Sequence, residues 1–383
     1  MDRGAVDRRR SCIHIPMNTV LPAEVLVACG AAYNLLAIAG AARFRSRKGP
    51  VTSYQPPVSI LKPVRGRDLG FYEAIRSHAA QDYPEFELLF GVADLADPAV
   101  ADIERLQREF PHIPIRVLQT ANEAPNRKAG SLEILAREAR HQVLLVNDGD
   151  ITVPSGYLKH VLGYLEDEAV GLVTCLYRGR GESLPASAEA LGIGTEFAPS
   201  VLVARLLSST GFALGSTMAF RRRELDAIGG FQVIREYLAD DYQLGARISA
   251  LGKRIEMARM VVETNLGTGS AVEVWRHQVR WSRTIQISRP GGYLGYVVTH
   301  ATFWCLVAAV LGAWPIALAG LAIRLAAAAS ALGALGASQA GLMAVPFRDL
   351  LGFAVWCAGL FGNTVEWRTD RFRLLSDGRM VRL

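Results

Sequence analysis

Cysteine and lysine are both scarce in this chain of 383 residues. The five cysteines are scattered through the sequence, at Cys12, Cys29, Cys175, Cys305 and Cys357. This spacing matches neither the disulfide framework of small secreted domains nor the clustered ligands of a zinc site. Unpaired thiols of this kind are typical of proteins in a reducing compartment.

Lysine supplies only five of the 42 basic residues, and the sequence contains no block of basic residues interleaved with aromatic ones. The formal net charge of +6 therefore does not predict a nucleic-acid partner. Arginine carries most of the positive charge, and its surplus is compatible with contact with an anionic membrane surface.

Charge is absent from two long stretches. Residues 25–42 contain no charged residue, are just long enough for a membrane helix, and are followed at once by four basic residues. A cleaved signal peptide would have a shorter apolar core and a polar mature start, so we expect an uncleaved transmembrane anchor at residues 20–43. Residues 293–323 also lack formal charge and are interrupted near Pro315, which predicts a helical hairpin.

The other segments complete the expected domain organisation. We expect a disordered segment at residues 1–19, a catalytic domain at residues 50–290, membrane helices at residues 293–366 and a basic tail at residues 367–383. Within the membrane region, Arg324 must face other helices or reach the interface. Residues 350–365 predict either a tilted span or an interfacial helix.

The orientation of the anchor depends on where translation starts. The arginines near the N-terminus match the basic residues after the anchor in number, and this conflict disappears if translation starts at Met17. The positive residues that follow the anchor then place the catalytic domain in the cytoplasm. We therefore expect an integral protein of the bacterial inner membrane.

Strand and helix patterns alternate between residues 58 and 174. Apolar runs at 58–61, 86–92, 115–118, 143–146 and 170–174 predict strands, and helical patterns occupy the intervals between them. This alternation predicts an α/β fold with a mostly parallel sheet and right-handed crossovers. In such sheets, ligands bind beyond the carboxyl ends of the strands.

Two carboxylates follow the most apolar of these strands. Residues 142–146 end at Asn147, and Asp148 and Asp150 come next, separated by one glycine. Carboxylates this close repel one another unless a cation lies between them, and hard oxygen ligands suit Mg²⁺ or Mn²⁺. The alternative is a simple Asp-Gly-Asp turn between a strand and a helix.

Other polar residues occupy comparable positions. Asp94 follows the strand at 86–92, and Asp240 and Asp241 begin an amphipathic helix. Acidic residues at a helix N-terminus also interact favourably with the helix dipole, which is a purely structural alternative for this pair. A second amphipathic helix, at 272–288, carries His277, Arg280 and Trp281. On periodicity, the alternative for His277 is a solvent-facing position on this helix.

Taken together, these stretches resemble the inverting glycosyltransferases of the family 2 and family 21 type. Within that group the sequence is similar to ceramide glucosyltransferases and to bacterial hopanoid-biosynthesis glycosyltransferases. The resemblance spans roughly residues 58–283 and is carried by Leu61-Lys62-Pro63, Val92-Ala93-Asp94, Asn126-Arg127-Lys128, Asn147-Asp148-Gly149-Asp150-Ile151, Ala239-Asp240-Asp241-Tyr242 and His277-Gln278-Val279-Arg280-Trp281.

The resemblance implies a nucleotide-sugar-binding (GT-A-like) fold with flanking membrane helices. It implies that Asp94 and Lys128 bind the nucleotide of a UDP-sugar, and that Asp148 and Asp150 hold a divalent cation on its diphosphate. Asp241 is implied as the general base that activates the acceptor hydroxyl, with Asp240 in support.

The last motif is implied to hold the diphosphate and to wall the acceptor site, through His277, Arg280 and Trp281. This chain departs from the common pattern at two positions. His277 stands where glutamine or arginine is common, and Asp240 stands where glutamate is frequent. Histidine can still donate a hydrogen bond to a phosphate oxygen, so we expect the motif to function.

The implied reaction moves glucose or N-acetylglucosamine from a UDP-sugar to a hydroxyl of a membrane lipid. The acceptor is a ceramide-type lipid or a hopanoid, and residues 171–179 look more like the hopanoid branch. The apolar residues 182–214 would rest on the bilayer beside the acceptor. A processive polysaccharide synthase and a non-catalytic nucleotide-sugar-binding scaffold are the alternatives.

Overall fold

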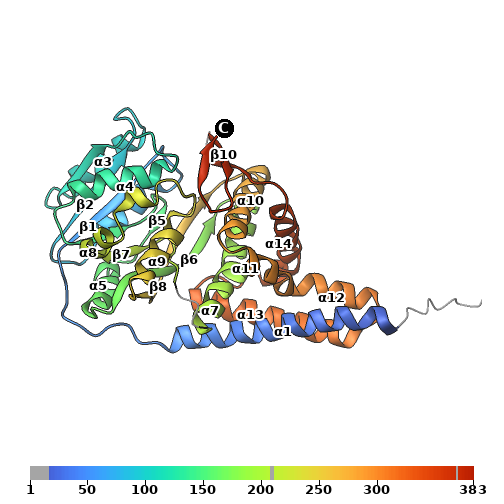
Figure 1. Cartoon of the computed structure of the whole chain (residues 1–383). Helices are drawn as coiled ribbons and strands as arrows, with labels where there is room; N and C mark the ends of the chain where they lie inside the picture. Colours follow the sequence, from blue (N-terminus) through green and yellow to red (C-terminus); the bar gives the residue numbers. More distant parts are fainter. Residues whose placement is uncertain (1–16, 208–210, 368–369) are drawn as a thin grey trace, which may run out of the picture.

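An eight-stranded mixed sheet forms the centre of the catalytic domain in the computed structural model, which describes residues 17–207, 211–367 and 370–383 (Figure 1). Of the segment predicted to be disordered, residues 1–16 lie outside the described residues. In spatial order the strands are β3 (Ile115–Gln119), β2 (Phe86–Val92), β1 (Val58–Pro63), β4 (Val143–Val146), β7 (Met218–Arg221), β6 (Val170–Gly181), β8 (Arg254–Gly267) and β5 (Ile151–Thr152).

Parallel pairing dominates the first half of the sheet. Strand β1 lies between β2 and β4 and is parallel to both, while β7 pairs antiparallel with β4 and with β6. Because β1, β2 and β4 are parallel, their carboxyl ends meet at one edge. The predicted α/β fold with a mostly parallel sheet is confirmed.

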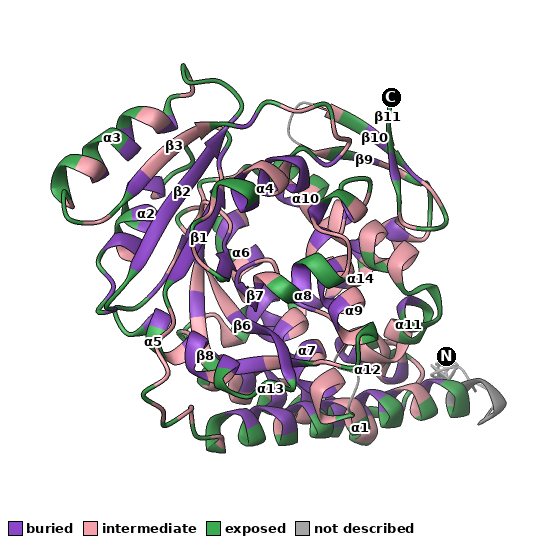
Figure 2. Cartoon of the chain, turned by 60° about the vertical axis from the view of Figure 1, so that its left-hand side comes forward, coloured by how far each residue is buried: buried purple, intermediate pink, exposed green. Residues whose placement is uncertain are grey.

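Helices cover both faces of this sheet and bury its apolar residues. The helices α2 (Phe71–Ala79) and α5 (Tyr157–Gly163) pack on one face, and α4 (Arg127–Glu138) packs on the other. Ile60 and Leu61 are adjacent in β1 yet both fully buried, on opposite faces. Each such side chain contributes about 1.5–3 kcal/mol when buried. Figure 2 shows β1 and β2 as almost continuously buried strands.

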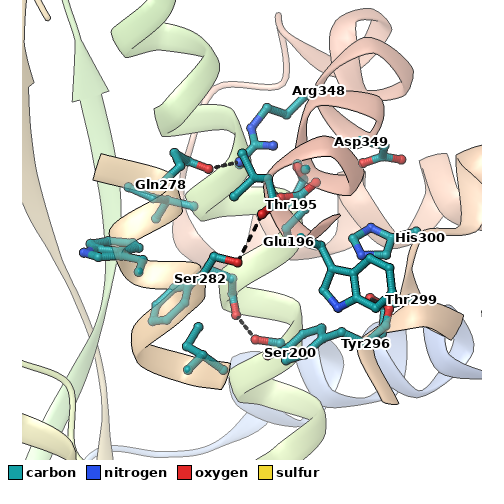
Figure 3. Close-up of a pocket in the computed structure, with 18 of the residues that line it drawn as sticks. Thr195, Glu196, Ser200, Gln278, Ser282, Tyr296, Thr299, His300, Arg348 and Asp349 are labelled. Carbon is teal, nitrogen blue, oxygen red and sulfur yellow. Dashed lines mark hydrogen bonds and ion pairs between the residues drawn. The ribbon is translucent and has the colours of Figure 1, made fainter. Parts of the chain in front are cut away.

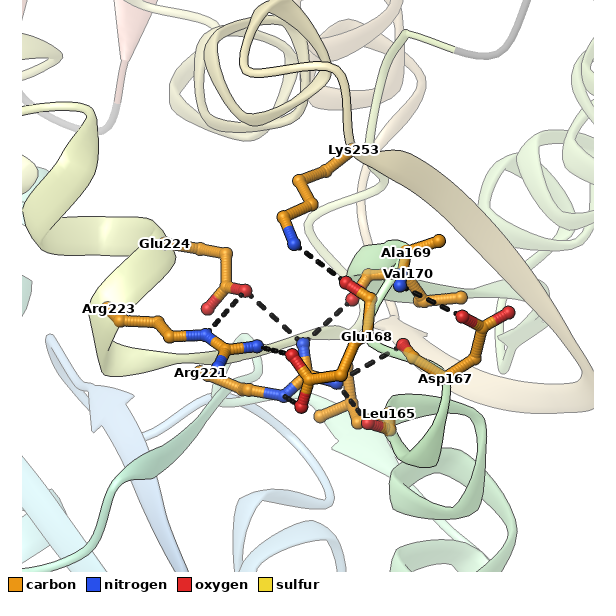
Figure 4. Close-up of polar contacts among 9 residues, drawn as sticks. All are labelled: Leu165, Asp167, Glu168, Ala169, Val170, Arg221, Arg223, Glu224 and Lys253. Carbon is orange, nitrogen blue, oxygen red and sulfur yellow. Dashed lines mark hydrogen bonds and ion pairs between the residues drawn. The ribbon is translucent and has the colours of Figure 1, made fainter.

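A buried arginine lies at the edge of the sheet opposite the carboxyl ends of β1, β2 and β4. Arg221, at the end of β7, lies beside Val143 at the start of β4, and its guanidinium donates to the carbonyl oxygens of Leu165 and Val170. Glu224 accepts from the same group at 3.3 Å (Figure 4). This cluster joins the turn before β6 to β7, so its role is structural.

Among the residues that the structure describes, three helices are long and apolar enough to cross a membrane: Leu21–Ser46, Trp314–Leu335 and Leu342–Gly359. A bent pair, Pro290–Thr299 and Ala301–Val310, passes the same criteria when counted as one broken span. In Figure 1 the three single helices are α1 (Met17–Ser46), α13 (Trp314–Leu335) and α14 (Val345–Gly359), the last together with the turn before it. The bent pair consists of α11 (Pro290–Gly295) with η4 (Tyr296–Thr299), followed by α12 (Ala301–Val310).

Helix α1 packs against α12 and α13, and its outward side remains exposed (Figure 2). The exposed residues include the apolar Leu21, Val25 and Leu35, which suit contact with lipid. On the inner side, Arg324 of α13 is 3% exposed and pairs with Asp349 of α14, with Nε 2.9 Å from Oδ2. The arginine expected to face other helices therefore does so, with a carboxylate as its partner.

Four elements connect the sheet to these membrane helices. The segment after β6 forms α6 (Leu184–Gly192), a π-helical turn η2 (Ile193–Phe197) and α7 (Ala198–Leu206), and α7 packs on α1. The fourth element, α10 (Ala271–Ser288), begins with a capping box between Ser270 and Glu273 and packs on α14. The apolar stretch expected on the bilayer surface thus contacts the anchor helix.

The C-terminal residues form a second sheet. Strands β9 (Thr364–Trp367), β10 (Asp370–Leu374) and β11 (Met380–Arg382) are antiparallel, where we expected only a basic tail. Val365, Phe372, Leu374 and Met380 of this sheet enclose a small core together with Leu238 of the catalytic domain. Arginines alternate with Phe372 and Leu374 in the sequence, and this period-2 pattern is typical of a strand, but the arginine content was interpreted as a basic tail.

Candidate active site

The loop after β4 lies at the carboxyl edge of the sheet and is fixed from below by buried polar groups. Asn147 is fully buried, and its Nδ2 donates to the Ser216 carbonyl oxygen at 2.6 Å and to the Tyr157 hydroxyl at 2.9 Å. Its Oδ1 lies 3.2 Å from Nε2 of His78, whose pKa is held well below its ordinary value by burial. These contacts fix the direction in which Asp148 and Asp150 leave the strand.

Lys62, at the end of β1, supports the same loop. Its side chain is fully buried and donates from Nζ to the backbone oxygen of Asp148 at 3.1 Å. Burial lowers the pKa of Lys62 to about 7, against the opposing attraction of Asp150 and Asp148. The sequence assigned no role to Lys62, although it belongs to a motif that carried the resemblance.

Asp148 and Asp150 present partly buried carboxylates beside one another. Oδ1 of Asp148 lies 2.7 Å from Nζ of Lys128, and Oδ2 of Asp150 accepts a hydrogen bond from the Thr264 hydroxyl. Burial and the charge of Asp148 raise the pKa of Asp150 above its ordinary value. Two carboxylates with excess negative charge fit a divalent cation.

The carboxylate pair also fits the coordination habits of Mg²⁺ and Mn²⁺. Among residues 17–207, 211–367 and 370–383, no group of three or more His, Cys, Asp or Glu side chains forms a complete cage for a metal. Mg²⁺ in nucleotide sites usually has one or two protein carboxylates and takes its other ligands from phosphates and water. Asp148 and Asp150 therefore suit a cation that arrives with a diphosphate.

Asp241 lies at the start of α9 (Asp240–Ala250) and is held by two backbone donors. Its Oδ1 accepts from the amide of Tyr242 at 2.7 Å, and its Oδ2 accepts from the amide of Gly215 at 2.9 Å. Burial and the neighbouring charge of Asp240 raise the pKa of Asp241 to about 6. A fixed carboxylate with such a pKa is suited to accept a proton near neutral pH.

Lys128 lies between the two groups of acids. Its Nζ is 3.2 Å from Oδ2 of Asp240 as well as 2.7 Å from Asp148, and it is also attracted by Asp241. Burial alone would lower the pKa of Lys128, but these carboxylates outweigh burial and raise it above its ordinary value. Lys128 thus joins α4 to the strand-end acids and to the start of α9.

Gly215 marks the point where these side chains converge. A Cβ atom at this position would lie 3.3 Å from Oδ2 of Asp148, 3.4 Å from Oδ2 of Asp241 and 3.6 Å from Nζ of Lys128. Sequence analysis missed Gly215 because it has no side chain and lies far from the acids in the sequence. Thr264 was missed for a similar reason, since its hydroxyl donates to Asp150 only because β8 pairs with β5 in the sheet.

Asp94 does not join this group. It is exposed after β2, and its Oδ1 accepts from the amide of Ala96 at 2.9 Å within its own turn. Strand β1 separates β2 from β4, so Asp94 lies two strands away from Asp148. A role for Asp94 at the nucleotide therefore requires an extended ligand.

The motif on α10 is anchored on two neighbouring elements. Nδ1 of His277 lies 2.6 Å from Oε1 of the buried Glu189 on α6, so this half-buried ring is held toward α6. The guanidinium of Arg280 stacks over the ring of Trp367 in β9 at 5.9 Å. The C-terminal sheet thereby contacts a residue that the resemblance assigned to the diphosphate.

A row of aromatic rings leads from this motif to the acids. The ring of Trp281 lies 4.7 Å from His277 and 6.1 Å from Phe197, and the ring of Phe197 lies 5.2 Å from Tyr177 on β6. Burial, followed by the charges of Asp241, Asp148 and Asp150, raises the pKa of Tyr177 well above its ordinary value. The charges of the acids therefore act on Tyr177, at the end of this row.

Comparisons with known proteins bear on this arrangement. The profile of glycosyl transferase family 21 matches residues 23–380. The chain is 26% identical to ceramide glucosyltransferase 1 of Caenorhabditis elegans over 229 residues, which cover 59% of this chain and 49% of that protein. It is 30% identical to the ceramide glucosyltransferase of Gibberella zeae over 158 residues, 37% of this chain and 28% of that one. The chain spans half or less of the length of these relatives.

One solved structure resembles nearly the whole chain. The mannosyltransferase PcManGT from Pyrobaculum calidifontis, solved with GDP-Man and Mn²⁺, matches with a TM-score of 0.56 and 20% identity, covering 89% of this chain and 99% of that one. At this level of identity the likeness establishes a shared fold. The expected GT-A-like fold with flanking apolar helices is confirmed.

Proposed function

Because the chain belongs to glycosyl transferase family 21, we propose that it is a membrane-bound inverting glycosyltransferase. It transfers glucose or N-acetylglucosamine from a UDP-sugar to a hydroxyl of a membrane lipid. The observation that carries this proposal is the convergence of Asp148, Lys128 and Asp241 around Gly215. That arrangement combines an acidic strand end for a cation-bound diphosphate with a separate, fixed carboxylate for proton transfer.

The general base in this proposal is Asp241. Its two backbone hydrogen bonds fix the carboxylate, and its pKa of about 6 keeps it deprotonated at neutral pH. It removes the proton from the lipid hydroxyl as that oxygen attacks the anomeric carbon from the face opposite the diphosphate. A single displacement of this kind inverts the anomeric configuration.

The residues proposed to bind the leaving diphosphate lie on the other side of the sugar. Asp148 and Asp150 would hold the divalent cation, and Lys128 keeps Asp148 oriented through the 2.7 Å ion pair. When bound, Mg²⁺ or Mn²⁺ offsets the negative charge that develops on the departing nucleoside diphosphate. Arg280, whose planar guanidinium suits phosphate oxygens, is proposed to contact the same diphosphate together with His277.

The lipid acceptor is proposed to be a ceramide-type lipid or a hopanoid, with the hopanoid favoured by residues 171–179. Similarity to the ceramide glucosyltransferases supports a lipid with a hydroxyl above a large apolar body. The membrane-length helices beside the domain support the same acceptor class, since they would hold the domain at the bilayer that contains such lipids. The catalytic domain is proposed to face the cytoplasm of a bacterium.

Mass spectrometry of defined reactions tests this function. The purified full chain is incubated with UDP-glucose or UDP-N-acetylglucosamine, Mn²⁺ or Mg²⁺, and either ceramide or a hopanoid polyol. We expect one glycosylated lipid and stoichiometric release of UDP. Polymer formed without a lipid acceptor would instead identify a polysaccharide synthase, and nucleotide binding with no product under any condition would identify a scaffold.

The rate should depend on pH through Asp241. Only the deprotonated carboxylate accepts a proton, so we expect kcat to fall as the pH falls through about 6 and to level off above it. The measurement is kcat between pH 5 and 8 at saturating donor and acceptor, with UDP-sugar affinity titrated over the same range. A kcat that stays constant down to pH 5, with donor still bound, would contradict the assignment.

Gly215→Ala tests the convergence point. The new Cβ would approach Asp148 and Asp241 to 3.3 and 3.4 Å, which is tight enough to move one of the carboxylates. We expect turnover to fall about tenfold, equivalent to about 1.4 kcal/mol, with the thermal unfolding temperature unchanged. The matched control is Gly156→Ala, because a Cβ there meets nothing within 4 Å. Equal activity of the two variants would show that the space at Gly215 is not needed.

A further inference from the structure

A cavity of about 150 Å³ lies between the catalytic domain and the membrane helices (Figure 3). Its lining comes from η2, α7 and α10 on the side of the catalytic domain, and from α1, α13 and α14 on the membrane side. Apolar walls such as Ile193 and Val355 alternate with polar groups such as Gln278, Glu196 and Arg348. The cavity is separate from the acids around Gly215, but Phe197 and Trp281 line it and belong to the aromatic row that ends at Tyr177.

Most polar groups in this lining are already satisfied by the protein. The Ser282 hydroxyl lies 2.5 Å from the Tyr293 hydroxyl, and the Thr195 and Ser200 hydroxyls donate to carbonyl oxygens of their own helix. Arg348 is different. Its side chain is 4% exposed, its Nη2 lies 2.8 Å from Oε1 of Gln278 and 3.1 Å from Oε2 of Glu196, and its Nη1 has no hydrogen-bond partner in the described part of the chain.

A second polar atom in the same cavity also lacks a hydrogen-bond partner among the described residues. This atom is Nε2 of His300, which is buried. A buried donor without a partner is costly, so a side chain kept in this state is usually completed by a ligand. The arginine offers a donor, and the Glu196 carboxylate offers an acceptor beside it.

Two glycines provide the space for these side chains. A Cβ at Gly192 would lie 2.2 Å from Nη2 of Arg348, and a Cβ at Gly352 would lie 2.2 Å from Oε1 of Glu196. Glu196 itself belongs to the π-helical turn η2, a form that is rare and is often found at functional sites. The chain is therefore shaped to bring this arginine and this glutamate together in the cavity.

The charges in the cavity select a neutral ligand. Arg324 and Arg348 are balanced by Asp349 and Glu196, and all four residues line the cavity. A nucleoside diphosphate would add two or more negative charges to this balanced set, and uncompensated charge is unfavourable in a buried site. A neutral head group with an acceptor oxygen for Nη1 of Arg348 and a hydrogen-bond donor for Glu196 fits these side chains, and membrane-length helices form part of the lining.

We propose that this cavity binds the polar head of the lipid acceptor, with an oxygen of the head accepting from Nη1 of Arg348 and a hydroxyl or amide N–H donating to Glu196. The head belongs to the class of neutral lipids that carry several hydroxyls, or a hydroxyl next to an amide. This inference rests on the proposed glycosyl transfer to a lipid. Phe197 and Trp281 then form the wall along which the reacting hydroxyl reaches Asp241.

Acceptor kinetics of Glu196→Gln test the proposal. The amide keeps the size of the side chain but replaces the charged acceptor, so we expect KM for the lipid to rise about tenfold while the KM for UDP-sugar stays unchanged. The matched control is Glu256→Gln, because Glu256 is also a partly buried glutamate paired with arginines, Arg47 and Arg205, but lies outside the cavity. Its kinetic constants should equal those of the wild type.

Photolabelling of the unmodified full chain provides a second readout that needs no variant. A ceramide with a photoreactive group near its head is irradiated with the protein, and the labelled peptides are mapped by mass spectrometry. We expect label within residues 278–300 and 345–356, and protection by whichever unlabelled lipid, ceramide or hopanoid polyol, is the better acceptor. Label confined to other segments, or an unchanged acceptor KM in Glu196→Gln, would overturn the assignment of the cavity.

Different outcomes would contradict the proposed function and the proposed location of the head group. If the wild-type chain transfers sugar to neither lipid, the proposed function is wrong and the acceptor site falls with it. If the wild type glycosylates a lipid but Glu196→Gln and Glu256→Gln behave alike, only the location of the head group is wrong.

Discussion

Asp241→Asn is expected to lower turnover by about two to four orders of magnitude, or about 3–5 kcal/mol, while UDP-sugar binding survives. Asparagine keeps the size of the side chain and one acceptor oxygen, so it retains one of the two hydrogen bonds from the amides of Tyr242 and Gly215, but it cannot take up a proton. The loss should therefore appear in kcat. The measurement pairs turnover with the lipid acceptor with calorimetric titration of the UDP-sugar.

Asp240→Asn is the natural comparison for this variant. Asp240 is buried and pairs with Lys128 at 3.2 Å, so its loss should disturb Lys128 and reduce the rate less than the loss of Asp241 does. If Asp241→Asn abolishes nucleotide binding and Asp240→Asn abolishes only turnover, the base is Asp240. The thermal stability of both variants distinguishes either result from misfolding.

The second large effect is expected at the end of β4. Asp148→Asn or Asp150→Asn should weaken cation-dependent binding of the UDP-sugar by more than the roughly 10- to 100-fold typical of residues that only support a metal ligand. The fold should persist, because both carboxylates lie beyond the strand and outside the apolar core. UDP-sugar titrations with and without Mn²⁺ measure the effect.

A carboxylate at the opposite edge of the sheet serves as the control. Asp167 is exposed and pairs with Arg254 at 2.7 Å near the start of β6, so Asp167→Asn should leave donor binding unchanged. If Asp148→Asn and Asp150→Asn retain full activity and the same Mn²⁺ or Mg²⁺ dependence, the Asp-Gly-Asp stretch is only a turn.

The parallel half of the sheet could be predicted from the sequence because its signal is local. Each strand of that half is a short apolar run followed by a helical pattern, and the acids at the ends of β2 and β4 follow directly from it. Strand β7 has only four residues and pairs antiparallel between β4 and β6, so no local period indicates it. The C-terminal sheet was missed although Arg371-Phe372-Arg373-Leu374 alternates with the period of a strand, because the arginines were interpreted as a basic tail.

Within the site, only residues with a chemically distinctive side chain could be predicted from the sequence. Asp148, Asp150, Asp240 and Asp241 were visible as acids at element ends, and the structure brings Asp148 and Asp240 together through Lys128. Gly215 contributes a backbone amide donor and the space left by its missing side chain, and neither contribution can be recognised from the residue type. Contacts such as that between Thr264 and Asp150 join positions 114 residues apart and exist only after the sheet has formed.

The position of the C-terminal sheet also limits how the chain threads through a bilayer. The amide of Met380 donates to the carbonyl oxygen of Glu236 at 2.8 Å, and Asp370 pairs with Arg65, so the last strands and the catalytic domain lie on the same side. The polypeptide must therefore cross an even number of times between residues 290 and 364. Three crossings, one each for the bent pair, α13 and α14, are excluded.

An even count therefore allows two of these three candidate segments to cross, or none of them. In Figure 1, α12 and α13 run alongside α1, whereas α14 runs across them, which suits a crossing hairpin and an interfacial α14. An even count returns the arginine-rich C-terminus to the side of the basic residues that follow α1, so both groups of positive charge obey the same orientation rule.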